Sequence, residues 1–207
     1  MLDWVINYLS SFIINSISSL GYFGVGLMMG IESACIPLPS EIIMPFSGFL
    51  VAKGTFTLLG IILAGSIGSV AGSILAYWVG KFGGRVFIEK YGKYILISHH
   101  DLNIADRFFQ KYGNWAVFFS RMMPIVRTFI SLPAGIARMN FTKFVIYTFV
   151  GSIPWCLALG YLGKKLGDHW EVLGAYFHQF DFVIVVIIIA MVIWYVWRHV
   201  RNTVRSL

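Results

Sequence analysis

Four charged side chains stand inside stretches that are otherwise apolar: Glu32, Glu41, Arg121 and Arg127. A charge at bilayer depth costs about 2.5–3.5 kcal/mol on insertion scales, so four of them cost about 10 kcal/mol unless they pair or reach water. The two acidic residues lie in one segment and the two basic residues in another, and their charges sum to zero. We therefore expect the two segments to face each other and to form a polar site inside a membrane.

The residue types in this site are suited to binding a phosphate group. Arginine presents a planar fork that binds phosphate with two hydrogen bonds and keeps its charge when it is desolvated. Helices that start just after Pro39 and Pro124 would add backbone N–H groups aimed at an anion. A buried carboxylic acid can exchange a proton near neutral pH. We predict a phosphate head group held by the two arginines, with proton movement through Glu32 and Glu41.

Three hydroxyl side chains beside these charges are candidate auxiliary donors to the substrate: Ser40, Ser120 and Thr128. Each hydroxyl is equally suited to capping its own broken helix. A second interpretation of the four charges is a buried ion-pair lock that joins the two segments. Buried pairs rarely add net stability over apolar packing, which favours the binding site over the lock.

Metal and nucleic-acid sites are weakly supported. His99, His100 and Asp101 are adjacent in sequence, and neighbouring residues on a helix point apart, so they are a poor ligand set. We expect neither a metal nor another cofactor. The net charge of +7 comes from basic residues that mostly lie between apolar runs, where they set membrane topology rather than bind nucleic acid.

The composition places these residues in a membrane protein. Of the 207 residues, 58% are hydrophobic and 12% are charged, whereas a soluble domain has about 25% charged residues. The chain is expected to be one membrane domain, with these successive parts: an interfacial helix at 1–19, a broken apolar segment at 20–53, a span at 56–80, a basic amphipathic linker at 81–112, a broken segment at 113–137, and spans at 141–163 and 181–198.

An internal repeat relates the two broken segments. Residues 52–57 (AKGTFT) match residues 137–142 (ARMNFT), and Gly80-Lys81 recurs as Gly163-Lys164. Repeat 1 then covers 20–80 and repeat 2 covers 113–163. Each consists of a broken segment, a short connector that contains Phe and Thr, and a spanning helix.

The length of the broken segments predicts how they enter the membrane. As one straight helix, residues 20–53 would extend about 50 Å, which is too long for one span, and each arm alone is too short to cross. A re-entrant hairpin resolves this, with turns at Pro37 and Pro39 in repeat 1 and at Pro124 in repeat 2. The predicted fold is an all-α integral membrane protein with inverted repeats, each a re-entrant hairpin plus a transmembrane helix, and an additional C-terminal transmembrane helix.

Charge and small residues add two further expectations. The linker at 81–112 and the C-terminal tail are both basic, so the positive-inside rule places both in the cytoplasm. The small residues Gly68, Gly72, Ala76 and Gly80 recur every four positions and allow another helix to approach closely, either within one chain or between copies in a homo-oligomer.

The two broken segments also carry motifs of a known family. The chain resembles the DedA family (the SNARE-associated or VTT-domain superfamily) over roughly residues 20–165. The motifs that carry the resemblance are Glu32-Ser33-x-x-Ile36-Pro37-x-Pro39-Ser40-Glu41, Phe119-Ser120-Arg121-Met122-x-Pro124-x-Val126-Arg127-Thr128 and Pro133-Ala134-Gly135. Some members place the second acid later, in a Gly-Asp context, whereas here Glu41 directly follows the Pro-x-Pro-Ser turn.

The resemblance implies a lipid transporter of the bacterial cytoplasmic (inner) membrane with two opposed re-entrant hairpins. Members are assigned to recycling undecaprenyl phosphate or to moving phosphatidylethanolamine, with links to the proton motive force. The family's membrane-embedded acidic and arginine positions correspond to Glu32, Glu41, Arg121 and Arg127. The expected partner is therefore a polyprenyl phosphate or a phospholipid.

A membrane lipid pyrophosphatase is the alternative function. Such an enzyme needs a nucleophile or a metal-bound water. The sequence offers serine and threonine without a histidine at membrane depth, so we predict a transporter rather than an enzyme.

Overall fold

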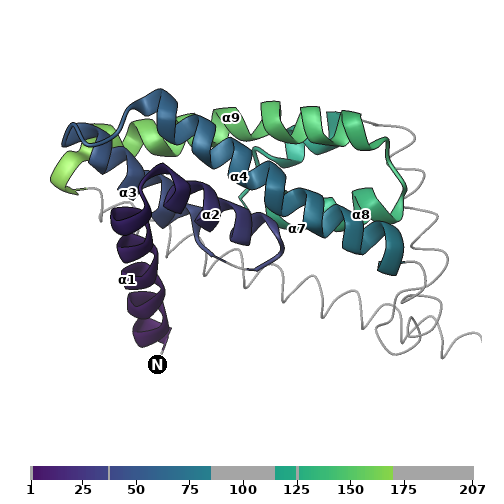
Figure 1. The fold of residues 1–207 in the computed structure, drawn as a ribbon, viewed down its shortest axis with the longest axis horizontal. Coiled ribbons are helices and arrows are strands. Elements are labelled where there is room, and N and C mark those ends of the chain that lie inside the picture. The colour runs from purple at the N-terminus through teal and green to yellow at the C-terminus, as the bar shows by residue number, and fades with distance from the viewer. Residues whose placement is uncertain (1, 37, 85–114, 125, 170–207) are drawn as a thin grey trace, which may run out of the picture. The chain divides into compact units, whose positions relative to one another are not determined.

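The computed structural model describes residues 2–36, 38–84, 115–124 and 126–169. The chain divides into two compact units, Met1–Trp170 and Glu171–Leu207, and all of the described residues belong to the first. Within these residues every regular element is a helix (Figure 1). This confirms the all-α class. The predicted linker at 81–112, apart from its first residues, and the predicted span at 181–198 lie outside the described residues.

The helices are α1 (Leu2–Leu20), α2 (Tyr22–Ser33), α3 (Ser40–Ala52), α4 (Leu58–Val79), α7 (Val126–Phe129), α8 (Ser131–Ile136) and α9 (Phe141–Leu166). A π-helical turn at Gly80–Gly84 follows α4, residues 115–120 are helical, and a 3-10 turn at Gly167–His169 follows α9.

Helices α4 and α9 are the two described helices that are long and apolar enough to cross a membrane. Each begins at a side-chain cap: Thr57 Oγ1 accepts from Gly60 N at 3.1 Å, and Asn140 Oδ1 accepts from Lys143 N at 3.1 Å. They run antiparallel to each other (Figure 1), with the first turn of α4 beside the last turns of α9.

The first broken segment, α2 and α3, begins at the same end as α4. Helix α2 runs parallel to α4, and the two backbones touch where Gly26 meets Gly68 and Gly30 meets Gly72. The predicted stripe of small residues therefore packs within the chain. Pro39 precedes the first residue of α3, where a proline's fixed φ is tolerated, and α3 turns back toward the end at which α2 began.

The second broken segment, residues 115–136, begins at the opposite end of the α4–α9 pair. Its first helix, 115–120, packs against Gly151 of α9, and α8 returns to pack against the end of α4. A small aromatic and aliphatic core forms here, in which the Tyr77 ring stacks on Phe144 with centroids 4.8 Å apart. The Tyr77 hydroxyl donates to the carbonyl of Met139.

The returning helix of each broken segment packs on the long helix of the other segment. In α3, Gly48 lies against the carbonyl of Gly160 and the amide of Lys164. In α8, Gly135 lies against the carbonyl of Tyr77 and the amide of Lys81 in the same way. Glycines on the long helices complete both contacts, because Gly163 meets Pro45 and Gly80 meets Leu132.

Helix α1 differs from the others in direction. Figure 1 shows it running across the direction of α4 instead of along it. Its last turns bury Ile13 and Ile17 against α2 and α3, while Phe12 and Leu20 are exposed. This orientation is compatible with the interfacial helix expected at 1–19.

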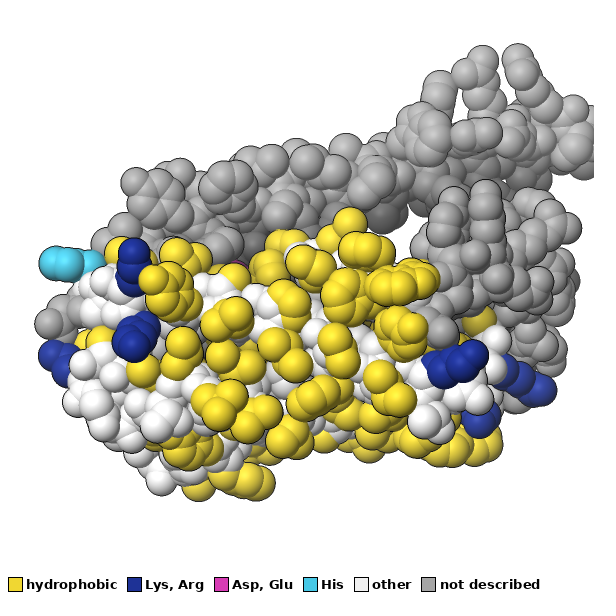
Figure 2. Space-filling view, turned by 90° about the horizontal axis from the view of Figure 1, so that it is seen from above, with side chains coloured by type: hydrophobic (Ala, Val, Ile, Leu, Met, Phe, Trp, Pro, Cys, Tyr) yellow, Lys and Arg dark blue, Asp and Glu magenta, His cyan; other side chains and the backbone are white. Residues whose placement is uncertain are grey.

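The outer surface carries an apolar band. Figure 2 shows hydrophobic side chains across the middle of one face and basic side chains at both of its ends. The exposed apolar residues of α4 include Leu59, Ile67 and Leu75, and those of α9 include Ile146 and Val150. Basic residues lie at the ends of the helices: Lys53 follows α3 and Lys164 and Lys165 are in the last turn of α9, whereas Lys81 follows α4, Arg138 precedes α9 and Lys143 is in its first turn. This is the distribution that a lipid bilayer favours.

The glycine contacts between α2 and α4 give a test of the packing. A Gly72→Ala substitution places a methyl group on the carbonyl oxygen of Gly30. Overpacking of this kind typically costs about 1–3 kcal/mol, and we expect a lower midpoint of thermal unfolding in detergent. Gly83→Ala is the matched control, since its added methyl group meets no atom of the described residues within 4 Å. Equal midpoints for the two variants would contradict the close contact.

Candidate functional site

The turns of the two broken segments meet in the interior and join an acidic side chain to a basic one. Arg127 Nη2 lies 3.2 Å from Glu32 Oε2, and both residues are almost fully buried. Glu32 is in the last turn of α2, where the helix dipole disfavours a carboxylate. The guanidinium of Arg127 offsets that cost, so the pair depends on contact between two segments that are 95 positions apart.

A tryptophan of α9 covers the Arg127 guanidinium. The Trp155 ring centroid is 5.4 Å from Arg127 Cζ, within the range of a cation–π interaction. The same indole donates from Nε1 to the hydroxyl of Ser40 at 3.4 Å. Trp155 therefore joins α9 to the first turn of α3 while it shields the charge.

The second arginine, Arg121, donates hydrogen bonds to neutral oxygens. Arg121 Nη1 donates to the backbone carbonyl of Arg127 at 2.9 Å, and Nη2 donates to Ser131 Oγ at 2.7 Å and, at 3.5 Å, to Thr148 Oγ1. The Arg121 side chain thus braces the chain segment that carries Arg127. Its guanidinium is buried together with that of Arg127, which concentrates positive charge in a small volume.

Both arginines keep a donor that has no acceptor in the described part of the chain. Arg127 Nη1 and Arg121 Nε are buried and make no hydrogen bond there, and the hydroxyl of Ser33 is in the same situation. A buried N–H of a charged group without an acceptor is costly. The cluster can therefore accept a further anionic or polar group.

The turns themselves are joined by a cysteine. Cys35 has a φ of 67°, which is uncommon for a residue other than glycine, and its Sγ donates to the carbonyl of Thr128 at 3.4 Å. Pro124 lies in the turn that precedes α7. Pro37, the other predicted turn residue, lies outside the described residues.

The remaining predicted site residues are also buried. Glu41 is 9% exposed in the first turn of α3, where the helix dipole favours a carboxylate. Ser40 accepts from Trp155, as described above. Ser120 donates to the carbonyl of Val117 at 2.7 Å and so caps its own helix, which was one of its two predicted uses. Thr128 is 8% exposed and follows Arg127 directly.

Three contacting residues were not predicted: Ser131, Thr148 and Trp155. The signal for Thr148 is its spacing, because Thr148 and Ser152 lie four apart on the buried face of an apolar helix. No comparable pattern marks Ser131 or Trp155. No group of three or more potential metal ligands occurs among the residues that the structure describes, and His99 and His100 lie outside them.

Comparisons with known proteins place the chain in a family. Residues 38–165 match the family model of the VTT domain, a range that contains Glu41, Arg121 and Arg127. No solved structure matches the chain.

Three relatives from bacteria align over most of their length. An uncharacterized membrane protein (YkoX) of Bacillus subtilis is 42% identical over 91% of this chain and 84% of its own. A protein of the same organism named undecaprenyl phosphate transporter A is 44% identical over 79% of this chain and 80% of its own. A Lactococcus lactis protein named alkaline phosphatase-like protein is 36% identical over 85% of each chain. From these matches and its own motifs, the chain belongs to the VTT-domain (DedA) family of membrane proteins.

Proposed function

We propose that this protein carries undecaprenyl phosphate across the bacterial cytoplasmic membrane and binds its phosphate group between the two broken segments. The observation that carries the proposal is the pair of buried guanidinium groups, each with an N–H that has no acceptor in the described part of the chain. Phosphate oxygens are suitable acceptors for both donors, because arginine binds phosphate through forked, charge-assisted hydrogen bonds.

The relatives support this substrate class. The chain is similar to a protein named undecaprenyl phosphate transporter A over four-fifths of that protein's length. A glycerophospholipid such as phosphatidylethanolamine also carries a phosphate group, so transport of that lipid is the alternative within the same chemistry. The two substrates differ in charge, and a phosphate monoester offers more acceptor oxygens to the two arginines than a phosphodiester does.

The arrangement of the helices supports a further part of the proposal. The broken segments begin at opposite ends of the α4–α9 pair, and their returning helices make matching glycine contacts with the two long helices. We infer two re-entrant hairpins in inverted repeats, with the candidate site near the middle of the membrane. The single membrane domain, the cytoplasmic linker at 81–112 and the cytoplasmic C-terminus remain parts of this proposal.

The site as it stands is closed. Both arginines are about 1% exposed, Trp155 covers Arg127, and the Cys35 thiol joins the two turns. A phosphate group can enter only if the turns separate on one side of the membrane. Separation on one side and then on the other would expose the arginines to each surface in turn, which is the alternating access expected of inverted repeats.

Glu32 couples this cycle to protons in our proposal. Its carboxylate and a phosphate compete for the same guanidinium, Arg127. When Glu32 accepts a proton, it releases Arg127 to the phosphate, and when the phosphate leaves, Glu32 loses the proton and pairs with Arg127 again. Glu41 is a second proton-exchange group at the start of α3. Ser40 and Thr128 are auxiliary donors to the head group.

Transport by the purified protein tests the proposal. In vesicles that contain a trace of fluorescent undecaprenyl phosphate, the wild-type chain should move the lipid from the outer to the inner leaflet, as followed by chemical quenching of the outer label. Unlabelled undecaprenyl phosphate should compete more strongly than phosphatidylethanolamine. Protein-free vesicles set the background. Movement no faster than that background would exclude the proposed function.

The phosphatase-like relative supplies a second candidate function, hydrolysis of a lipid phosphate. The same vesicles test it when loaded with undecaprenyl pyrophosphate, because hydrolysis releases inorganic phosphate. The described residues include no cluster of metal ligands that would activate a water. Our proposal of transport predicts no phosphate release, and sustained release would replace transport by catalysis.

A further inference from the structure

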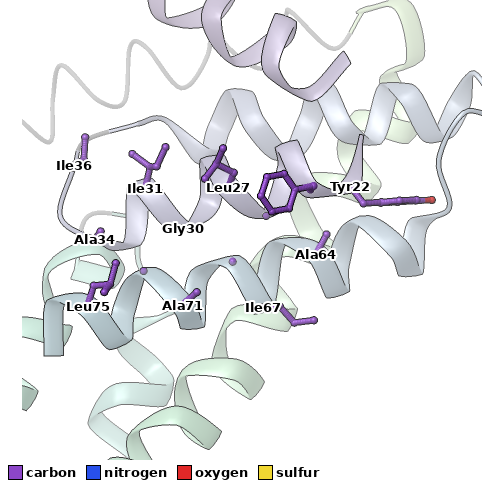
Figure 3. Close-up of a pocket in the computed structure, with 14 residues that line it drawn as sticks. Tyr22, Leu27, Gly30, Ile31, Ala34, Ile36, Ala64, Ile67, Ala71 and Leu75 are labelled. Atoms are coloured by element: carbon purple, nitrogen blue, oxygen red, sulfur yellow. The ribbon is translucent and has the colours of Figure 1, made fainter. Parts of the chain in front are cut away.

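An apolar groove runs along the outer side of α2 and α4. Its volume is about 540 Å³, within the range of small-molecule sites in proteins. Figure 3 shows Leu27 and Ile31 of α2 and Ile67 and Ala71 of α4 along its two sides. Among the described residues that line the groove, the hydroxyl of Tyr22 is the one polar side-chain group, and it accepts from Thr57 N at 2.7 Å. The described lining therefore favours an apolar ligand over a polar one.

The groove ends beside the candidate phosphate site. Ala34 and Ile36, which flank Cys35 in the first turn, line its far end. Cys35 contacts the carbonyl of Thr128, the residue that follows Arg127. The apolar groove and the buried arginines thus converge on one turn, the groove from outside and the arginines from within.

The helix pair α2–α4 separates an apolar outer side from a polar inner side. The outer side bears the groove, whereas the inner side of α4 buries the hydroxyls of Ser69 and Ser73, and α2 buries Glu32. Contacts between glycine backbones close the seam between the two helices. A charged head group therefore cannot cross this seam and reaches the arginines only around the turn.

We propose that the groove holds the hydrocarbon chain of the transported lipid phosphate while its head group occupies the arginine site. This inference rests on the proposed function and adds a binding site for the other half of the same molecule. Helix α2 has 12 residues and is about 18 Å long, so the groove guides a chain through roughly half of the bilayer core. Lipid tails are as apolar as the groove, so its role is to align the chain, and the arginines supply the affinity.

Photolabelling of the wild-type protein locates the chain directly. A polyprenyl phosphate with a photoreactive diazirine in its isoprenoid chain is reconstituted at trace level in phosphatidylglycerol and phosphatidylethanolamine vesicles, and its adducts are mapped by mass spectrometry. We expect severalfold more adducts on Leu27, Ile31 and Ile67 than on the exposed α9 residues Ile146 and Val150. Excess unlabelled undecaprenyl phosphate should remove that difference. A diazirine phosphatidylcholine should label both faces evenly.

A second experiment fills the groove with a large side chain and measures the effect on transport. Ala71 is exposed on α4 within the groove, and Ala158 is also exposed, on α9 outside the groove. Ala71→Trp should reduce transport severalfold, whereas Ala158→Trp should leave it at the wild-type rate. A tryptophan on either surface faces lipid, so both variants should unfold at the same temperature.

The outcomes separate this inference from the function on which it rests. Transport with evenly spread adducts, or with equal rates for the two tryptophan variants, overturns the groove and keeps the transporter. A disulfide that joins two copies of an Ala71→Cys variant through the groove shows a protein interface instead and also overturns the inference. Absence of transport by the wild-type protein overturns both proposals.

Discussion

An Arg127→Met substitution is expected to abolish lipid-phosphate transport and to lower the free energy of unfolding by about 3–5 kcal/mol. The loss of stability arises because Glu32, whose carboxylate lies 3.2 Å from the guanidinium, would be left buried without its counter-charge. The loss of transport arises because the variant removes the donor that we assign to the phosphate. Thermal unfolding in detergent and leaflet exchange in vesicles measure the two effects separately.

A double variant separates the binding site from an ion-pair lock. Replacing both partners of a buried pair by apolar residues of similar volume is often neutral or stabilising. Arg127→Met combined with Glu32→Met should therefore recover most of the lost stability. If the pair only holds the two segments together, transport returns with the stability. We expect the double variant to fold and to remain inactive, and recovery of transport would contradict the assigned role of Arg127.

Glu32→Gln addresses the proton separately from the charge. Glutamine keeps the shape and the hydrogen bond to Arg127 but cannot exchange a proton. If Glu32 protonation releases Arg127 to the phosphate, this variant loses the dependence of transport on a pH gradient across the membrane. The matched measurement is the wild-type rate with and without that gradient.

Long apolar runs made the two long helices predictable. The expected spans at 56–80 and 141–163 correspond to α4 (Leu58–Val79) and α9 (Phe141–Leu166). An uninterrupted apolar stretch has one low-cost conformation in a membrane, because a helix satisfies every backbone hydrogen bond internally. The prolines likewise predict a helix boundary from local sequence, since Pro39 directly precedes the first residue of α3.

The pairing inside the site was less accessible from sequence. The expectation of carboxylates facing guanidiniums holds for Glu32 and Arg127. Arg121 instead donates to a backbone carbonyl and to Ser131 and Thr148, which are neutral and common residue types. Charge counting identifies which residues need partners, but it does not choose between a distant carboxylate and a nearby hydroxyl. That choice depends on how α8 and α9 pack.

The glycines show a related limit. Their spacing predicts that a helix approaches α4 closely, yet it does not say which helix. In the structure Gly72 contacts α2 and Gly80 contacts α8, so the one stripe packs against two different helices. The match of Gly80 with Gly163 was visible as a sequence repeat. The sequence does not show that α3 packs on α9 and α8 packs on α4, because these contacts form only when the whole bundle assembles.

An Arg121→Lys substitution is expected to destabilise the protein by about 3 kcal/mol and to reduce transport strongly, although it conserves the charge. A guanidinium reaches the Arg127 carbonyl and Ser131 Oγ at the same time, at 2.9 and 2.7 Å, from two different nitrogens. A lysine ammonium is a compact point charge and cannot reproduce that fork. Each hydrogen bond lost from a charged group costs about 1.5–3 kcal/mol.

Two milder variants give the graded control for Arg121. Ser131→Ala removes the 2.7 Å contact and should cost about 1–3 kcal/mol, whereas Thr148→Val removes a contact at 3.5 Å and should cost less. The expected order of destabilisation is Arg121→Lys, then Ser131→Ala, then Thr148→Val, measured as unfolding midpoints in detergent. Transport should fall in the same order, because Arg121 positions the backbone that carries Arg127, in addition to its proposed contact with the phosphate. If Arg121→Lys folds and transports like the wild-type protein, charge alone suffices at this position and the bracing role is wrong.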